Sequence, residues 1–187
     1  KLDPAYEVIF ANNDKVTIAG ETEDIISSFE KIEPGAAHKL SQFLRKAKSN
    51  YEVAIKNLVY KPGRSPMELV NIKTIARAKQ FFNKISHETE KVCQDPRLRK
   101  ILEFPALFLG AKPSRTPAFY NFMNYADFGL GTWHPIGGMY TVVEAMVELA
   151  ESLGVQFHYN SPVEHITNGQ PGKASGILIR NKQVKAD

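Results

Sequence analysis

The chain has 187 residues, of which 43% are apolar and 24% charged, and its formal net charge is +4. This composition is ordinary for a globular protein with a sizeable core. Basic residues are mixed along the chain rather than interleaved with aromatic ones, so the sequence argues against a nucleic-acid partner. No apolar run approaches the length of a membrane span, and a single cysteine excludes an internal disulfide.

The first part of the chain predicts a hairpin followed by two helices. Residues 6–10 and 15–19 alternate apolar and polar side chains around the turn residues 12–14. Apolar residues at helical spacing then predict a helix that Thr22 caps. A Pro-Gly pair ends this helix, and a long amphipathic helix is expected over residues 40–58.

Further helices are predicted after a turn at residues 61–64. One short helix begins at Ser65, and a helical pattern covers residues 72–82. Ser86 is expected to cap the next helix, and Asp95, which precedes a proline, the one after it.

Two later segments are unusually apolar. Residues 104–110 are apolar nearly all round, and residues 119–125 form an aromatic-rich helical pattern. Such segments belong either to ordinary core or to the wall of a long apolar cavity, and both interpretations stay open. Cys93 is expected to be a small buried residue rather than a nucleophile.

The most informative stretch is residues 131–139, in which Gly137 and Gly138 lack a Cβ atom. A helical pattern begins at Met139 and ends at Gly154, and residues 155–159 alternate like a strand. The N-terminus of this helix could hold a small anionic or polar ligand group. Alternatively, the glycine pair only packs tightly against a neighbouring strand.

The last part predicts short strands and turns. Residues 162–166 are expected to form a strand, residues 168–172 a turn, and residues 174–179 and 183–186 a further hairpin. The sequence starts without Met and stops within a strand-like pattern, so we expect an excerpt of a longer protein. There is no glycine-rich dinucleotide loop and no catalytic triad spacing, and the scattered histidines predict no metal site.

Several segments together carry a family resemblance: residues 2–6, 32–35, 95–99, 106–110 and, most specifically, 133–139, with further matches from 153 to 166. Along them the chain resembles the phytoene desaturase (carotenoid desaturase) family of flavoproteins, whose members include retinol saturase-like enzymes. The resemblance implies a full-length FAD enzyme that desaturates, isomerises or saturates a long polyene. It also implies that this excerpt, which lacks the pyrophosphate loop, binds no FAD alone.

The same resemblance implies the roles of individual residues. Gly137, Gly138 and Met139 would lie near the flavin, and Val163 on a strand that meets the adenine of FAD. The substrate path would be lined by five apolar or aromatic residues, namely Phe104, Leu107, Phe108, Phe119 and Tyr120. No catalytic residue is assigned, because a flavin performs the redox chemistry while the protein orients the substrate and excludes water.

We therefore predict an α+β protein with a helical layer on a mixed sheet in a substrate-side domain, residues 1–130. Residues 131–187 would be an incomplete α/β segment of the FAD-binding domain. A cytoplasmic protein bound peripherally to a membrane surface is expected, and no oligomeric state is assigned. Two alternatives stay open: an amine oxidase-like flavoenzyme, favoured by a compact polar pocket, and a non-catalytic lipid-binding or membrane-docking module, favoured by an apolar patch without a tunnel.

Overall fold

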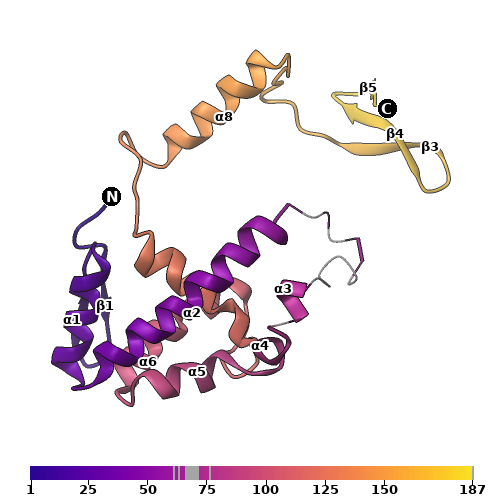
Figure 1. Cartoon of the computed structure of the whole chain (residues 1–187). Helices are drawn as coiled ribbons and strands as arrows, with labels where there is room; N and C mark the ends of the chain where they lie inside the picture. Colours follow the sequence, from indigo (N-terminus) through magenta and orange to yellow (C-terminus); the bar gives the residue numbers. More distant parts are fainter. Residues whose placement is uncertain (61, 63, 66–71, 76, 187) are drawn as a thin grey trace. The chain divides into compact units, whose positions relative to one another are not determined.

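The computed structural model describes residues 1–60, 62, 64–65, 72–75 and 77–186 (Figure 1). The chain divides into two compact units, Lys1–His134 and Pro135–Asp187. The expected domain boundary between residues 130 and 131 stays a prediction, because it separates regions by what they bind, whereas the two units are separated by their internal contacts. Each unit is described by itself.

Unit 1 begins with the predicted hairpin, which the structure confirms. Strand β1 (Tyr6–Ile9) pairs antiparallel with β2 (Lys15–Ile18), and Tyr6 lies opposite Ile18. Asn13 in the turn has a positive φ of 59°, a conformation that asparagine tolerates better than most residues. The apolar face of β2 turns inward, so that Ile18 is buried in the core.

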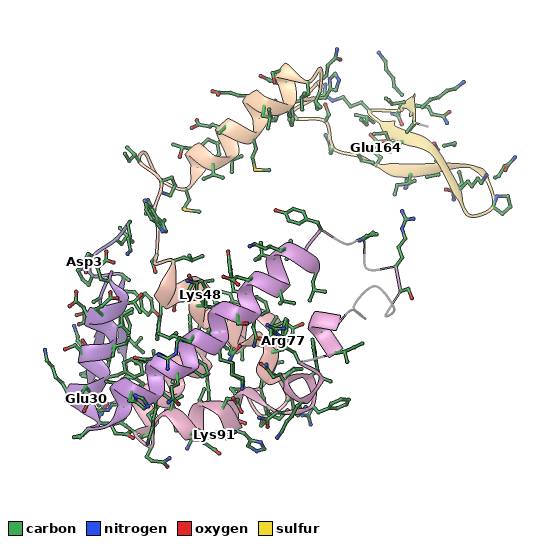
Figure 2. All side chains as sticks on the ribbon, in the orientation of Figure 1. Asp3, Glu30, Lys48, Arg77, Lys91 and Glu164 are labelled. Atoms are coloured by element: carbon green, nitrogen blue, oxygen red, sulfur yellow. The ribbon has the colours of Figure 1, made fainter. Side chains whose placement is uncertain are left out.

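Helices α1 (Thr22–Ile32) and α2 (Ala36–Asn57) follow, as the apolar spacing predicts. Gly35, with a φ of 88°, separates them. The Glu30 carboxylate accepts hydrogen bonds of 2.8 Å from the backbone N–H groups of Gly35 and Ala37 and so stabilises the start of α2 (Figure 2). The predicted Thr22 cap is wrong: Glu21 is the cap residue, and the Thr22 hydroxyl donates instead to the distant Phe128 carbonyl at 2.7 Å.

The middle of unit 1 is made of short helices: α3 (Ile72–Ile75), α4 (Ala78–Phe82), α5 (Ile85–Val92) and α6 (Pro96–Glu103). The predicted turn at 61–64 and the helix beginning at Ser65 fall largely outside the described residues.

The two predicted caps of α5 and α6 have different outcomes. Ser86 is not the cap of α5, because a bridge between Lys84 and Pro117 holds Lys84 extended and starts the helix at Ile85. The Asp95 cap is confirmed, since its carboxylate accepts from the Arg97 backbone N–H at 2.8 Å.

Tight helical turns complete unit 1. The apolar segment forms a 3-10 helix, η2 (Phe104–Leu109), and the aromatic segment forms three short pieces: η3 (Ala118–Asn121), α7 (Phe122–Asn124) and the π-helical turn η4 (Tyr125–Gly129). Prolines stand at the start of both segments, and Gly110, with a φ of 62°, ends the first. Both segments are helical as predicted, but neither continues as one regular helix.

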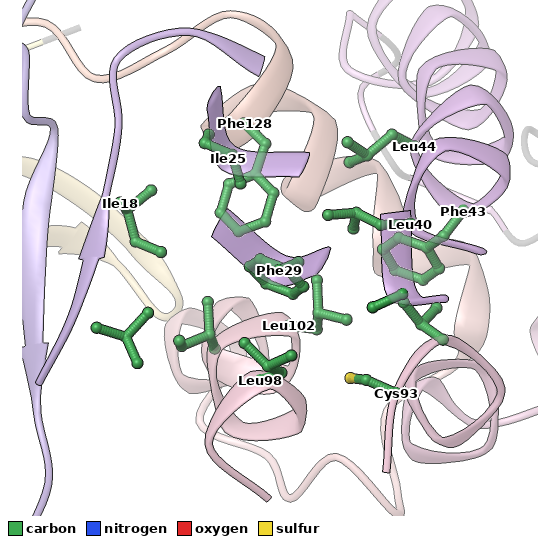
Figure 3. Packing of buried hydrophobic residues seen from close by; sticks show 14 of the residues in the cluster. Ile18, Ile25, Phe29, Leu40, Phe43, Leu44, Cys93, Leu98, Leu102 and Phe128 are labelled. Atoms are coloured by element: carbon green, nitrogen blue, oxygen red, sulfur yellow. The ribbon is translucent and has the colours of Figure 1, made fainter. Parts of the chain in front are cut away.

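The core of unit 1 lies between β2, α1, α2 and α6 (Figure 3). Phe29 is 0% exposed and meets Phe128 edge-on, with ring centroids 6.1 Å apart. Cys93 is fully buried among the same residues, as predicted, and desolvation raises the pKa of its thiol to about 12. A second, smaller cluster packs Phe119 against Val53 and Ala54.

Unit 2 consists of helix α8 (Tyr140–Ser152) and the antiparallel strands β3 (His165–Gln170), β4 (Lys173–Ile179) and β5 (Lys182–Lys185), in the order β3-β4-β5. Gly154, with a φ of 88°, follows α8 as predicted. The last hairpin is confirmed, with Arg180 and Asn181 at positive φ in its turn. The predicted turn at 168–172 is shorter, because β3 continues to Gln170.

Residues 155–159 are not a strand, which corrects the sequence-based prediction. A strand needs a neighbour to receive its backbone hydrogen bonds, and no described strand pairs with this segment. Within the described residues of unit 2 only Gly176 is buried. The apolar stripe of α8 is exposed, namely Val142, Val143, Met146 and Leu149.

The α+β class is confirmed, but the predicted mixed sheet is not seen among the described residues. Both sheets, β1-β2 and β3-β4-β5, are purely antiparallel, since tight turns join their consecutive strands. In the part of the chain that is described, no helix is long and apolar enough to cross a membrane.

Candidate functional site

A cavity of about 1120 Å³ lies within unit 1. Three parts of the fold form most of its wall: the whole of β1 with Phe10, the end of α6 with η2, and the segment of α7 and η4. The apolar and aromatic lining residues include Val8, Phe10, Tyr51, Ile55, Ile101, Phe104, Pro105, Leu107, Phe108, Phe122 and Met123. A cavity of this size with such a wall suits a large apolar ligand.

The η2 side of the cavity reaches the surface. Pro105 stands in the first turn of η2 and is buried, while Phe104, Leu107 and Phe108 are 47%, 67% and 71% exposed. Phe104 and Phe108 lie edge-to-face with ring centroids 5.6 Å apart. Because these side chains both line the cavity and face solvent, the cavity opens beside η2.

Polar and charged residues interrupt the apolar wall, and we call three of them, Tyr6, Asp127 and Thr132, the polar cluster. The Tyr6 hydroxyl donates to Oδ2 of Asp127 at 2.6 Å, and the Thr132 side chain also donates to this carboxylate. Burial raises the pKa of Asp127 above its ordinary value, although both donors oppose the shift. Burial, together with the neighbouring carboxylate, also raises the pKa of Tyr6.

The charged residues that also line the cavity have other surroundings. Glu7 pairs with Lys15 at 3.2 Å on the exposed side of the hairpin. Glu103 accepts a hydrogen bond of 2.9 Å from the Thr89 hydroxyl, and Lys100 is exposed. Glu103 is thus a second half-buried carboxylate with a hydroxyl donor, whereas in the polar cluster two hydroxyl groups converge on Asp127.

The structure brings three of the five expected substrate residues together, since Phe104, Leu107 and Phe108 all line the cavity. The other two lie outside its wall. Phe119 is 3% exposed and stacks on Phe81 with centroids 4.7 Å apart, and Tyr120 lies beside Phe119. Sequence reasoning missed the β1 wall and the polar cluster, because only the tertiary contact between residues 6 and 127 places them together.

The residues expected at the flavin lie in unit 2. Gly137 and Gly138 have positive φ angles of 90° and 96° directly before α8. A Cβ atom on Gly138 would meet no atom within 4 Å, whereas one on Gly137 would lie 2.8 Å from Cγ2 of Thr141. The positive φ of both residues is a local reason for glycine in this turn.

Met139 and Val163 are both exposed, at 62% and 52%. Val163 precedes β3 rather than lying on it, which corrects its expected place on a strand. The pairing begins only at the next residue, where the Glu164 N–H donates to the Leu178 carbonyl at 2.8 Å. Among the described residues, no group of three or more His, Cys, Asp or Glu side chains gathers to hold a metal ion.

The family model described as flavin containing amine oxidoreductase matches residues 13–187. The chain belongs to this family of flavin-containing amine oxidoreductases. Within it, the chain is 32% identical over 175 residues to a carotenoid 3,4-desaturase of Haloarcula japonica, covering 92% of this chain and 35% of that protein. It is 30% identical over 187 residues to a zeta-carotene-forming phytoene desaturase of Myxococcus xanthus, covering 98% and 36%.

A phytoene desaturase of Neurospora crassa is 24% identical over 190 residues, covering 97% of this chain and 32% of that protein. The resemblance to phytoene and carotenoid desaturases is thereby confirmed along nearly the whole chain. This flavin-containing amine oxidoreductase chain spans about a third of the length of these relatives.

Proposed function

We propose that the full-length protein is an FAD-dependent oxidoreductase that desaturates, isomerises or saturates a long polyene. The observation that carries the proposal is the cavity of about 1120 Å³ in unit 1, whose wall is almost entirely aliphatic and aromatic. A polyene offers carbon surface and few polar groups, so a mostly apolar wall suits it. The desaturase names of the relatives support the same substrate class.

The residues of unit 2 fit a role in holding FAD. The backbone at Gly138 is open, because a Cβ atom there would meet nothing within 4 Å, and it stands before the N-terminus of a 13-residue helix. Such a terminus favours anionic and polar ligand groups. Bound FAD would supply the redox chemistry by accepting or returning hydrogen, while the protein positions the polyene and keeps water out.

The finer fold belongs to the same proposal. We assign residues 131–187 to the FAD-binding domain, with Val163 close to the adenine. The exposed apolar stripe of α8 supports this assignment, because a stripe of this kind normally packs against a neighbouring element.

An amine oxidase-like reaction is the second candidate, and the description of the matching family favours it. The cavity argues for the polyene, since a small polar amine would need a compact polar pocket. The two reactions are separated by adding each substrate class to the purified full-length protein without oxygen. A polyene should bleach oxidised flavin if the protein desaturates it, restore the absorbance of pre-reduced flavin if the protein saturates it, or be recovered as an isomer from the reduced protein, and an amine should do none of these. Purification without flavin, or bleaching by the amine alone, would refute the proposal.

The isolated chain of residues 1–187 is expected to retain no FAD. It has no glycine-rich loop to present backbone N–H groups to a pyrophosphate. Flavin absorbance in the purified chain, at one flavin per molecule, would contradict this expectation.

We also propose that the protein sits peripherally on a membrane at the cytoplasmic side and collects its substrate there. Exposed Leu107 and Phe108 beside the cavity opening could enter the lipid surface, and the exposed Lys100 and Lys112 flank them. A non-catalytic docking module would need the same patch but not the cavity behind it.

Sedimentation with anionic liposomes tests the membrane proposal. Phe108→Ser should reduce binding at low salt, whereas Phe82→Ser, at an 82% exposed phenylalanine of α4, is the matched control. Added salt should weaken the binding of all forms, because it screens the lysines. Equal sedimentation of both variants would remove the support for docking through η2.

A further inference from the structure

The polar cluster gives the cavity hydrogen-bonding groups to which a pure hydrocarbon cannot bind. We propose that Tyr6, Asp127 and Thr132 anchor a hydroxyl group on the polyene, so that the site selects a hydroxylated polyene over the matching hydrocarbon. The inference rests on the proposed function, because it assigns a substrate class to the same cavity.

The first step is that the cluster is held in place before any ligand arrives. Tyr6 is the first residue of β1 and pairs with Ile18 of β2. Asp127 belongs to η4, whose Phe128 carbonyl accepts from the Thr22 hydroxyl at 2.7 Å. The Thr132 carbonyl accepts from the backbone N–H of Leu2 at 2.9 Å. Contacts from Ile18, Thr22 and Leu2 thus hold the cluster in place, which limits the entropy lost on binding.

The second step is the count of hydrogen bonds. A carboxylate offers two oxygens and about four acceptor sites. The side chains of Tyr6 and Thr132 donate to Asp127 and so use part of this capacity. A ligand hydroxyl can donate to an acceptor site that remains, and Tyr6 and Thr132 already use their hydroxyl hydrogens on Asp127.

The third step is the direction of the preference. Asp127 is half-buried in the cavity wall, so its carboxylate has lost part of its hydration, and this burial also raises its pKa. A hydrocarbon in the cavity would exclude water from Asp127 without returning a donor, whereas an alcohol returns one. Glu7 competes poorly for the same hydroxyl, because it is exposed and pairs with Lys15 at 3.2 Å. Glu103, half-buried and accepting from Thr89 at 2.9 Å, is the other carboxylate of the wall, and substitution of Asp127 distinguishes the two.

The test compares three matched ligands on the purified full-length protein: all-trans-retinol, its hydrocarbon analogue axerophthene and retinylamine. Equilibrium dissociation constants are measured by retinoid absorbance and fluorescence. The unmodified protein should bind retinol about tenfold more tightly than axerophthene, as expected for one hydrogen bond to a charged acceptor. Asp127→Asn should reduce that ratio several-fold while the affinity for axerophthene stays unchanged.

Two further variants keep the result interpretable. Asp24→Asn, at an exposed position of α1 outside the cavity wall, is the matched control and should keep the full ratio. Asp127→Leu, which preserves the approximate shape but accepts no hydrogen bond, should bring the ratio to about one. Thermal unfolding of each preparation identifies a variant that has lost its fold, and Asp127→Asn then carries the test.

The possible outcomes separate this inference from the proposed function. Equal binding of retinol and axerophthene, or a full ratio retained in Asp127→Asn, overturns the hydroxyl anchor and leaves the polyene cavity standing. Binding of neither ligand overturns both. Tighter binding of retinylamine than of retinol also overturns the anchor, and it favours the amine oxidase-like reaction.

Discussion

Gly138, directly before α8, allows a sharp test of the turn that we assign to the flavin site. Its φ is 96°, and an added Cβ atom would meet no atom within 4 Å. Alanine there causes no steric overlap within the described residues, so its cost is backbone strain alone. Left-handed backbone costs a non-glycine residue about 1–2 kcal/mol, and Gly138→Ala should lower the free energy of unfolding by this amount.

Gly172 provides a matched control in the same unit. It has a φ of 79° in the turn between β3 and β4, and its added Cβ atom would likewise meet nothing within 4 Å. Gly172→Ala should therefore lower the free energy of unfolding by about 1–2 kcal/mol through the same backbone strain. The two variants differ only in their place relative to α8, so a difference in turnover reports on the site and not on stability.

If the missing side chain makes room for the flavin or the polyene, Gly138→Ala keeps its fold and most of its flavin but loses most of its turnover. A small displacement of a reacting group can reduce the rate by a large factor. Thermal midpoint, flavin occupancy and polyene conversion are measured on one preparation of each full-length variant. Equal turnover per bound flavin in the Gly138 and Gly172 variants would refute the reasoning and leave the glycine a role in the turn only.

Three further predictions concern the core, a helix cap and the thiol. Phe29→Ala should lower the free energy of unfolding in urea by about 3–5 kcal/mol, because Phe29 is 0% exposed, and Phe104→Ala, at 47% exposure, should cost clearly less; similar costs would be inconsistent with the packing described. Hydrogen bonds from Arg97 lower the pKa of Asp95, so Asp95→Asn should destabilise the protein at neutral pH, and the difference should vanish as the pH falls through that lowered pKa; a difference independent of pH would exclude the charge as its cause. Cys93, which is 0% exposed, should react with a thiol reagent only after unfolding, and equally fast labelling of the native protein would contradict its burial.

The local elements of this protein could be predicted from sequence because each depends on neighbouring residues. Alternation around Asn13 produces the β1-β2 hairpin, and apolar spacing produces α1, α2 and α8. Asp95 before a proline starts α6 as expected. The two cap predictions that failed, Thr22 and Ser86, did so because distant segments act on these helix starts: the Phe128 carbonyl accepts the Thr22 hydroxyl, and Pro117 bridges Lys84.

The residues of the candidate site were only partly predictable. Phe104, Leu107 and Phe108 were found because an apolar segment that is not a regular amphipathic helix is conspicuous in the sequence. Phe119 also lies in an apolar and aromatic stretch of the sequence, yet it packs against Val53 in a separate cluster. Periodicity shows that a side chain is apolar and on which face of its element it lies, but not what covers that face.

The sequence by itself determined the family, the α+β class and the order of the elements, since motif, turn residues and periodicity are all local in the chain. Only the tertiary structure decided that β1 forms a wall of the cavity and that Tyr6 reaches Asp127, 121 residues further along the chain. The physical reason is that a cavity arises from the packing of several elements whose faces are separately ordinary. The role of a half-buried carboxylate such as Asp127 can be inferred only once the neighbours that desolvate it and donate to it are known.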